Sequence, residues 1–287
     1  MGDAGVRAVV LGAAQDGGRP QVGCDCRNCR LARTEPGEAE GPSSLAIVDD
    51  RAHRFWILDL TPDFARQFDW LRETLGAPYT FSGAVLTHAH IGHYLGILQL
   101  GREVMSTREV PIYGSAAMMT FLRTHGPFSQ LVSLGNIRLM PLPPDVPERL
   151  AEDIEITLTP VPHRQEWSDT MAITVRGPQR SLMYLPDIDR WDLWDRPIRD
   201  VVKGVDLAFL DATFFDEEEL PGRDRAEIPH PTVVETLAAL GPLPVAHPSR
   251  VQLIHLNHSN PLWEREKAAS LKQKGVTVAR RGDVHWL

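Results

Sequence analysis

Apolar and polar positions alternate along the chain in two recurring patterns. Short apolar runs rich in β-branched residues are typical of buried strands, whereas apolar positions three and four residues apart are typical of helices. The first pattern predicts strands at 6–12, 44–49, 54–60, 83–90, 111–114, 154–163, 171–177, 180–187, 205–215, 251–258 and 276–279.

The second pattern predicts helices between these strands, at 62–75, 93–105, 115–126, 231–240 and 261–274. Two of these helices have clear end signals. Pro62 stands in the first turn of one, while Ser115 and Gly126 would cap and stop another. Strands that alternate with helices predict an α/β fold of mixed sheets with helices outside, and no low-complexity linker divides residues 1–287, so we expect a single domain. The pattern alone does not distinguish a doubly wound sheet from a two-sheet sandwich.

Composition and charge limit the kinds of partner that the protein is expected to bind. Of 287 residues, 43% are hydrophobic and 24% charged, and the formal net charge is −8. An acidic chain lacks the basic surface that nucleic acid requires, so we expect no nucleic-acid partner. The first apolar run is too short for a signal peptide or a membrane span, so we expect a cytoplasmic protein without membrane contact. A small-molecule substrate is the expected partner, and a homodimer is the one assembly that we consider.

Three histidines stand within six residues in the segment THAHIGH, directly after an apolar strand: His88, His90 and His93. A lone histidine is usually solvated or a hydrogen-bonded core residue. Three at this spacing can turn their imidazoles toward one cavity, and neutral imidazole binds zinc, iron, manganese or copper. The spacing therefore predicts a metal site.

The segment HAHIGH resembles the H-x-H-x-D-H signature of the metallo-β-lactamase superfamily, with Gly92 in place of the aspartate. Other segments resemble the remaining motifs of the superfamily, in order. LDLTPD offers Asp59, which the resemblance makes a support of the metal loop, and VPHRQEWSDT offers His163 as the third ligand of a first metal, after His88 and His90.

Two later motifs complete this resemblance. YLPDID offers Asp187 as the catalytic carboxylate that bridges two metals, and QLIHLNHSNP offers His255 as a ligand of the second metal, together with His93. The opening segment VLGAAQDGGRPQVGCDCRNCRLAR is similar to the branch formed by the pyrroloquinoline-quinone (PQQ) biosynthesis protein PqqB and the phosphonate-pathway phosphodiesterase PhnP. LNHSNP and FLDATFFDEEEL resemble late segments of PqqB in particular. The resemblance implies an αβ/βα four-layer sandwich with two mixed β-sheets and the site at one edge of the sheets.

The three cysteines of the chain stand together as Cys24, Cys26 and Cys29, in an N-terminal loop at about 13–34. A closed structural zinc site needs one ligand beyond these thiolates. In the phosphonate-pathway relative that ligand is a late histidine before a helix, and His230 stands in the matching place. The zinc would tie the N-terminal loop to the C-terminal half. A redox pair of Cys26 and Cys29 is the alternative.

Glycine at position 92 can neither bind a metal nor hold a water molecule. The second metal would then keep His93, Asp187 and His255, which leaves either a single catalytic metal (Zn, Mn or Fe) or a weaker second site. The nearest carboxylates by motif position are expected to orient the histidines rather than to compensate, and they are Asp63, Glu166 and Asp169.

Three functions follow from this set of residues. The first is hydrolysis of a small, anionic phosphodiester or related ester by metal-activated water, with His258 as general acid for the leaving group. A hydrogen-bonding structural role for His258 remains the alternative. The second function is an oxidative, PqqB-like role in the biosynthesis of a PQQ-type cofactor, with iron in the site. The third is a carrier that kept the fold and lost the second metal through Gly92.

Overall fold

The computed structural model describes residues 5–219, 228–243 and 250–287. Within these residues the strands form two sheets, each of mixed direction. The first sheet pairs antiparallel strands at one side and parallel strands at the other, in the order β14-β1-β2-β3-β4-β5-β6. Its strands are β1 (Val6–Gly12), β2 (Ser44–Asp49), β3 (Arg54–Leu58), β4 (Thr80–Val85), β5 (Val110–Gly114), β6 (Ile137–Pro141) and β14 (Val284–Trp286).

The second sheet has the order β13-β12-β11-β10-β9-β8-β7 and is antiparallel from β7 to β10, then parallel to β13. Most positions of its parallel strands are buried because both faces of these strands are covered. The strands are β7 (Glu148–Ala151), β8 (Ile154–Val161), β9 (Thr170–Arg176), β10 (Ser181–Leu185), β11 (Leu207–Asp211), β12 (Val251–Ile254) and β13 (Val276–Val278).

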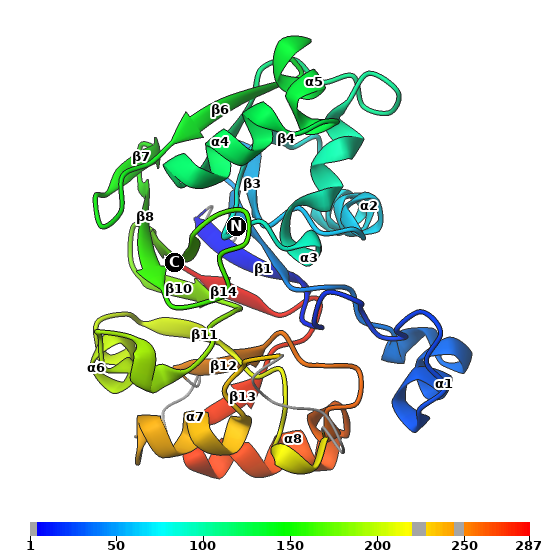
Figure 1. The fold of residues 1–287 in the computed structure, drawn as a ribbon, viewed down its shortest axis with the longest axis vertical. Helices are drawn as coiled ribbons and strands as arrows, with labels where there is room; N and C mark the ends of the chain where they lie inside the picture. Colours follow the sequence, from blue (N-terminus) through cyan, green and yellow to red (C-terminus); the bar gives the residue numbers. More distant parts are fainter. Residues whose placement is uncertain (1–4, 220–227, 244–249) are drawn as a thin grey trace.

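Helices cover the outer face of each sheet (Figure 1). Apolar residues of the first sheet pack in one cluster with α2 (Phe64–Leu75), α4 (Ala116–Thr124) and α5 (Phe128–Ser133). A separate cluster joins the second sheet to α6 (Ile198–Lys203), α7 (Val233–Leu240) and the C-terminal turns around α8 (Arg265–Ser270). The arrangement of helices, sheet, sheet and helices is the expected four-layer sandwich.

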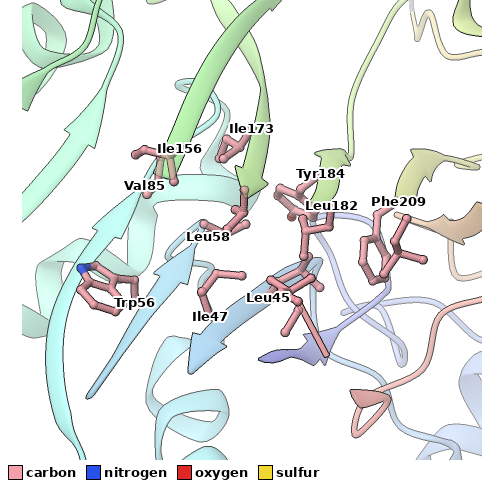
Figure 2. Close-up of a cluster of buried hydrophobic side chains, with 14 of the residues drawn as sticks. Leu45, Ile47, Trp56, Leu58, Val85, Ile156, Ile173, Leu182, Tyr184 and Phe209 are labelled. Atoms are coloured by element: carbon pink, nitrogen blue, oxygen red, sulfur yellow. The ribbon is translucent and has the colours of Figure 1, made fainter. Parts of the chain in front are cut away.

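The inner faces of the two sheets meet in a third apolar cluster (Figure 2). Leu45 and Leu58 of the first sheet face this cluster, as do Leu182 and Phe209 of the second. The Tyr184 hydroxyl crosses between the sheets and donates a hydrogen bond to the Ser43 carbonyl at 3.0 Å. This shared core fixes the two sheets against each other and so brings the loops at their common edge together.

Most predicted strands and the helices around 62–75, 115–126 and 231–240 are confirmed, with small shifts at their ends. The predicted helix 93–105 is instead the one-turn α3 (Ile91–Tyr94) followed by a 3-10 turn at Leu95–Leu100. The Gly96 backbone N–H donates to the Leu60 carbonyl at 2.9 Å, and the His93 carbonyl accepts from the Leu60 N–H at 2.8 Å, so these groups do not continue a regular α-helix.

The prediction of one continuous helix over 261–274 is also wrong. The segment divides into a 3-10 turn at Pro261–Trp263, α8, and a second 3-10 turn at Leu271–Lys274. The Trp263 indole donates to the Asn257 carbonyl at 2.7 Å, and Glu264 is extended after it, so the chain bends at this point. The pattern also missed the short elements β6, β7, β14, α1 (Arg27–Thr34), α5 and α6. Within the described residues, no helix is long and apolar enough to cross a membrane.

Candidate metal centre

The predicted metal ligands gather where strands end, in the loops that follow β4, β8, β10 and β12. His88, His90 and His163 form the first group. His88 Nε2 lies 2.9 Å from His90 Nδ1, and His163 Nε2 lies 3.2 Å from the same atom. Tetrahedral ligands at about 2.1 Å from one zinc ion would lie about 3.3 Å apart, so these three nitrogens fit one metal ion.

Neighbouring side chains hold these imidazoles by their other ring nitrogens. The Thr87 hydroxyl lies 2.9 Å from His88 Nδ1, and the Asp189 carboxylate lies 2.7 Å from His163 Nδ1. Glu166 lies 2.9 Å from His90 Nε2, which confirms that this carboxylate orients a histidine. Such contacts fix both the tautomer and the direction of a metal-binding imidazole. Each donor nitrogen is thereby turned inward.

A second group combines His93, Asp187 and His255 with Asp16, a residue of the loop after β1. His93 Nε2 lies 2.7 Å from Asp187 Oδ2 and 3.3 Å from Asp16 Oδ1, and His255 Nε2 lies 3.3 Å from that same Asp16 oxygen. Among the described residues, His93 Nε2 is a buried nitrogen without a hydrogen-bond partner. A nitrogen close to two carboxylates but bonded to neither is the arrangement that ligands of one metal ion adopt.

Asp187 connects the two groups. Its Oδ2 atom lies 3.5 Å from His88 Nε2 of the first group and 2.7 Å from His93 Nε2 of the second. The side chain is 3% exposed. A buried carboxylate in reach of both donor sets is placed where it could bridge two ions, and the bridging role that the resemblance implies stays a prediction.

Neighbouring side chains also orient the imidazoles of the second group through their Nδ1 atoms. Asp59 lies 2.7 Å from His93 Nδ1 and accepts hydrogen bonds from the Thr87 backbone and hydroxyl. The Thr213 hydroxyl lies 2.9 Å from His255 Nδ1. Asp59 and His255 both have φ 64°, the left-handed region that costs a non-glycine residue roughly 1 kcal/mol or more. Both residues stand directly after strands. The strained backbone at these positions directs their side chains into the centre.

The electrostatics of the centre favour the metal-binding protonation state for four of the candidate ligands, His88, His90, Asp187 and Asp16. Burial lowers the pKa of His88 well below its usual value and also lowers that of His90, so both are neutral imidazoles. For Asp187, burial raises the pKa, but the imidazoles of His255 and His93 outweigh it and hold the pKa well below the usual range. Burial likewise raises the pKa of Asp16, but the neighbouring His255 and His93 outweigh burial and hold the pKa well below its usual range. Neutral imidazoles and ionised carboxylates are the forms that bind metals. His93 differs: burial lowers its pKa, but the Asp59 and Asp187 carboxylates outweigh burial and raise the pKa well above its usual value. Metal binding at His93 would therefore displace a proton.

His258 does not lie in this centre, so its prediction as general acid is wrong. Its Nδ1 atom lies 3.5 Å from both Cys24 Sγ and Cys26 Sγ, and it completes a group of four with Cys29. Zinc bonds of about 2.3 Å to sulfur and 2.1 Å to nitrogen would place such ligands roughly 3.5 Å apart. The loop after β12 turns back to the cysteine loop, which is why a residue only three positions past His255 reaches a different site.

The cysteine loop continues into α1, at the margin of the molecule (Figure 1). Cys26 is the N-cap of this helix, and its sulfur accepts from the Cys29 backbone N–H at 3.4 Å. The Asn28 amide donates to the His258 carbonyl at 3.0 Å, which holds the two loops together from the other side. The four side chains fit a closed tetrahedral site better than a pair of redox thiols.

His230 is correspondingly absent from the cysteine group, so its prediction as the fourth ligand there is wrong. It lies in the main centre, with Nδ1 2.8 Å from Asp211 Oδ2 and its ring 5.6 Å from that of His163. Burial lowers the pKa of His230, but the Asp211 carboxylate outweighs burial and raises it to about 9. Asp211, His230 and His255 are also close enough to form a donor set. However, Thr213 donates to Asp211 from both its backbone and its hydroxyl, which marks Asp211 as a hydrogen-bonded support.

Sequence reasoning missed Asp16 and Asp211. Asp211 is the last residue of β11, and Asp16 lies in the loop that begins after Gly12 at the end of β1. The nearness of both residues to a strand end was the available signal. Of the carboxylates weighed as orienting groups, Asp169 accepts a hydrogen bond from the Ser115 hydroxyl rather than from a histidine. Asp63 stands just before α2 and outside the groups that could hold a metal.

Comparison with known proteins agrees with this geometry. A family model described as a beta-lactamase superfamily domain matches residues 55–256. The chain therefore belongs to the metallo-β-lactamase superfamily, and it is similar to PqqB proteins over nearly its whole length.

Two curated relatives are coenzyme PQQ synthesis proteins B. The protein from Cupriavidus necator is 27% identical over 305 residues, which cover 95% of this chain and 97% of the relative. The protein from Nitrosococcus oceani is 28% identical over 321 residues, with the same shares of 95% and 97%.

Two solved structures have the same fold. Zinc-bound PqqB from Methylobacterium extorquens superposes with a TM-score of 0.81 at 19% identity, covering 98% of this chain and 100% of that one. A diphosphatase of the PhnP family superposes with a TM-score of 0.70 at 22% identity, covering 98% and 97%.

Proposed function

We propose that this protein is a metal-dependent hydrolase that cleaves a small anionic ester, such as a phosphodiester. One observation carries the proposal: two sets of inward-facing donors stand side by side, with the buried Asp187 carboxylate in reach of both. The diphosphatase with the same fold is consistent with phosphoester chemistry. We expect zinc, manganese or iron in the centre, and zinc at the group of Cys24, Cys26, Cys29 and His258.

The residues of the centre would have two kinds of role, metal binding and orientation of the metal-binding imidazoles. His88, His90 and His163 would hold one ion, and His93, Asp187 and His255 would hold a second. When bound, such ions lower the pKa of water and polarise the ester oxygen. Asp59, Asp189 and Glu166 keep the imidazoles in the correct tautomer, so the protein does not have to reorganise during the reaction.

In this proposal His230, and not His258, is the general acid for the leaving group. Asp211 holds its Nδ1, which fixes the ring beside His163 and His255 in the centre. A histidine kept in place by a carboxylate can give a proton to a leaving group. Bound divalent ions and a charged His230 would each attract the negative charge of a phosphodiester, which is consistent with an anionic substrate.

His163 provides the first test. Replacing His163 with Ala should abolish hydrolysis of bis(4-nitrophenyl) phosphate by the metal-loaded protein, because the first ion loses one of its three protein ligands. The matched control is His53→Asn, since His53 is exposed and asparagine tolerates its φ of 49°. Unchanged turnover in His163→Ala, or none in the wild type across zinc, manganese and iron, contradicts the hydrolase.

A second candidate function rests on the relatives. Similarity to PQQ synthesis proteins B over 95% of the chain favours an oxidative or carrier role in the biosynthesis of a PQQ-type cofactor. The discriminating measurement is oxygen consumption by the iron-loaded protein with a catechol-type substrate. Oxygen uptake without ester hydrolysis would favour this role over the hydrolase.

A further inference from the structure

We propose that Asp16 supplies the carboxylate that the metal-binding motif lacks at Gly92, so that the loop after β1 completes the second metal site. The inference rests on the proposed metal centre and names a ligand outside the histidine motif. It replaces the expectation of a centre that is one carboxylate short.

The first argument is the space beside Gly92. A Cβ atom on Gly92 would lie 2.0 Å from Asp16 Oδ1, 2.4 Å from Asp16 Cγ and 2.8 Å from Asp16 Cβ. Atoms that are not bonded do not approach so closely, so any side chain at position 92 would occupy the volume that Asp16 fills. The carboxylate therefore stands where a side chain of the motif would begin.

The second argument is the direction of the neighbouring imidazoles. Asp59 occupies His93 Nδ1 and Thr213 occupies His255 Nδ1, so both rings present Nε2 to the centre. Asp16 Oδ1 lies 3.3 Å from each Nε2 atom. One carboxylate oxygen at equal distance from two imidazole nitrogens, which come from distant parts of the chain, marks a shared point of coordination.

The third argument is that the chain holds Asp16 in place before any ligand binds. The Gln15 backbone N–H donates to the Leu256 carbonyl at 2.9 Å, which ties the loop directly beside His255. Three residues after Asp16, Arg19 pairs with Glu38 at 2.6 Å and stacks on Trp263 at 4.7 Å. A carboxylate anchored on both sides loses little conformational freedom when a metal binds.

Asp16 and Gly92 therefore form a compensating pair. A chain with carboxylates at both positions would have a steric clash, and a chain with neither would lose a ligand. The prediction is a reciprocal exchange: Asp16→Gly should weaken the second site, and adding Gly92→Asp to that variant should restore it.

The experiment measures metal content and affinity rather than turnover. Wild type, Asp16→Gly, Gly92→Asp and the double variant are loaded with zinc, dialysed and analysed for metal per chain, and affinity is obtained by chelator competition. We expect Asp16→Gly to lose one ion per chain or to bind it at least about 100-fold more weakly. Gly92→Asp should also lose affinity because of the clash, whereas the double variant should regain the ion.

Controls separate a lost ligand from a lost fold. Asp63→Asn changes another acidic residue near the centre and should keep the wild-type metal content, as should Gly37→Ala, where a Cβ meets open space. Asp16→Asn keeps the shape of the side chain and should still lose affinity, with an unchanged circular dichroism spectrum.

Retention of the full metal content and affinity in Asp16→Gly would overturn the inference, and so would a double variant that binds no better than Asp16→Gly. These outcomes differ from a failure of the hydrolase proposal. A protein that binds its metals through Asp16 but hydrolyses no ester would refute the proposed activity alone.

Discussion

At the scale of single residues, Glu40 is a buried carboxyl group beside the loop that carries Asp16. Its Oε1 atom is buried without a hydrogen-bond partner among the described residues. Burial raises the pKa of Glu40 to about 7, although the Arg281 backbone N–H and the charges of Arg281, Arg280 and Arg19 oppose this effect. The carboxyl group is therefore held in a place that disfavours its ionised form.

This pKa predicts the sign of a pH dependence. The unfolded chain ionises Glu40 near pH 4.5 and the folded chain near pH 7. Between these values the unfolded state binds fewer protons, so this group's contribution to the unfolding free energy falls as pH rises and then levels off. Glu40→Gln should remove this pH-dependent contribution to the unfolding free energy. Relative to wild type, the variant should gain about 2 kcal/mol between pH 5 and pH 8.

Urea denaturation with saturating metal at both pH values would measure this difference. Parallel pH profiles for Glu40→Gln and wild type would contradict the prediction.

At the scale of elements, the short α3 explains how one segment serves two ions. His90 is extended before the helix begins at Ile91, with ψ 143°, and His93 lies within its single turn. The change of backbone conformation sends His88 and His90 to the first group and His93 to the second. A regular helix from His88 onward would have spread these imidazoles around its axis.

The start of α7 supports the loop that carries His230. The Thr232 hydroxyl accepts from the Glu235 backbone N–H at 3.1 Å, and Glu235 accepts from the Thr232 backbone N–H at 2.7 Å. Loss of this capping box in Thr232→Ala should lower the unfolding free energy by about 1 kcal/mol, because helix N–H groups lose their partner. Thr232→Ser keeps the hydroxyl and should stay near wild type in the same urea titration. An equal loss in both variants would assign the effect to side-chain packing instead.

At the scale of the whole molecule, the cysteine group joins the two segments that meet in the second metal group. Cys24 follows Asp16 in the N-terminal loop, and His258 follows His255 after β12. An ion held by Cys24, Cys26, Cys29 and His258 would fix both loops outside the centre. Such an ion would link the cysteine group mechanically to the second metal group.

Loss of the ion from the cysteine group should weaken metal binding at the second group more than at the first. Cys26→Ser should lose the thiolate-bound zinc and weaken the second site by about 10-fold, since Asp16 and His255 are no longer held together. The first site, on His88, His90 and His163, should keep its affinity. Arg27→Ala is the control, because the exposed Arg27–Glu264 pair joins the same segments but contributes little. Equal weakening of both sites in Cys26→Ser would indicate general unfolding.

The sequence by itself indicated the superfamily and most of the strands and helices. It also indicated which side chains gather in the main centre, namely His88, His90, His93, His163, Asp187 and His255. Those residues follow apolar strands within recognisable motifs, and a local pattern is enough to place a side chain at the end of a strand. The four-layer arrangement followed from the resemblance rather than from periodicity, because the same strand pattern fits more than one sheet topology.

Only the tertiary structure decided which residues complete each metal group. His258 lies with the three cysteines and His230 lies in the main centre, the reverse of their predicted places, and Asp16 lies against Gly92. These outcomes depend on how loops from opposite ends of the chain meet where the two sheets pack together, as in the bridge between Ala14 and Leu256. Contacts between residues more than 200 positions apart leave no signal in local sequence periodicity, because their separation is set by the packing of the whole core.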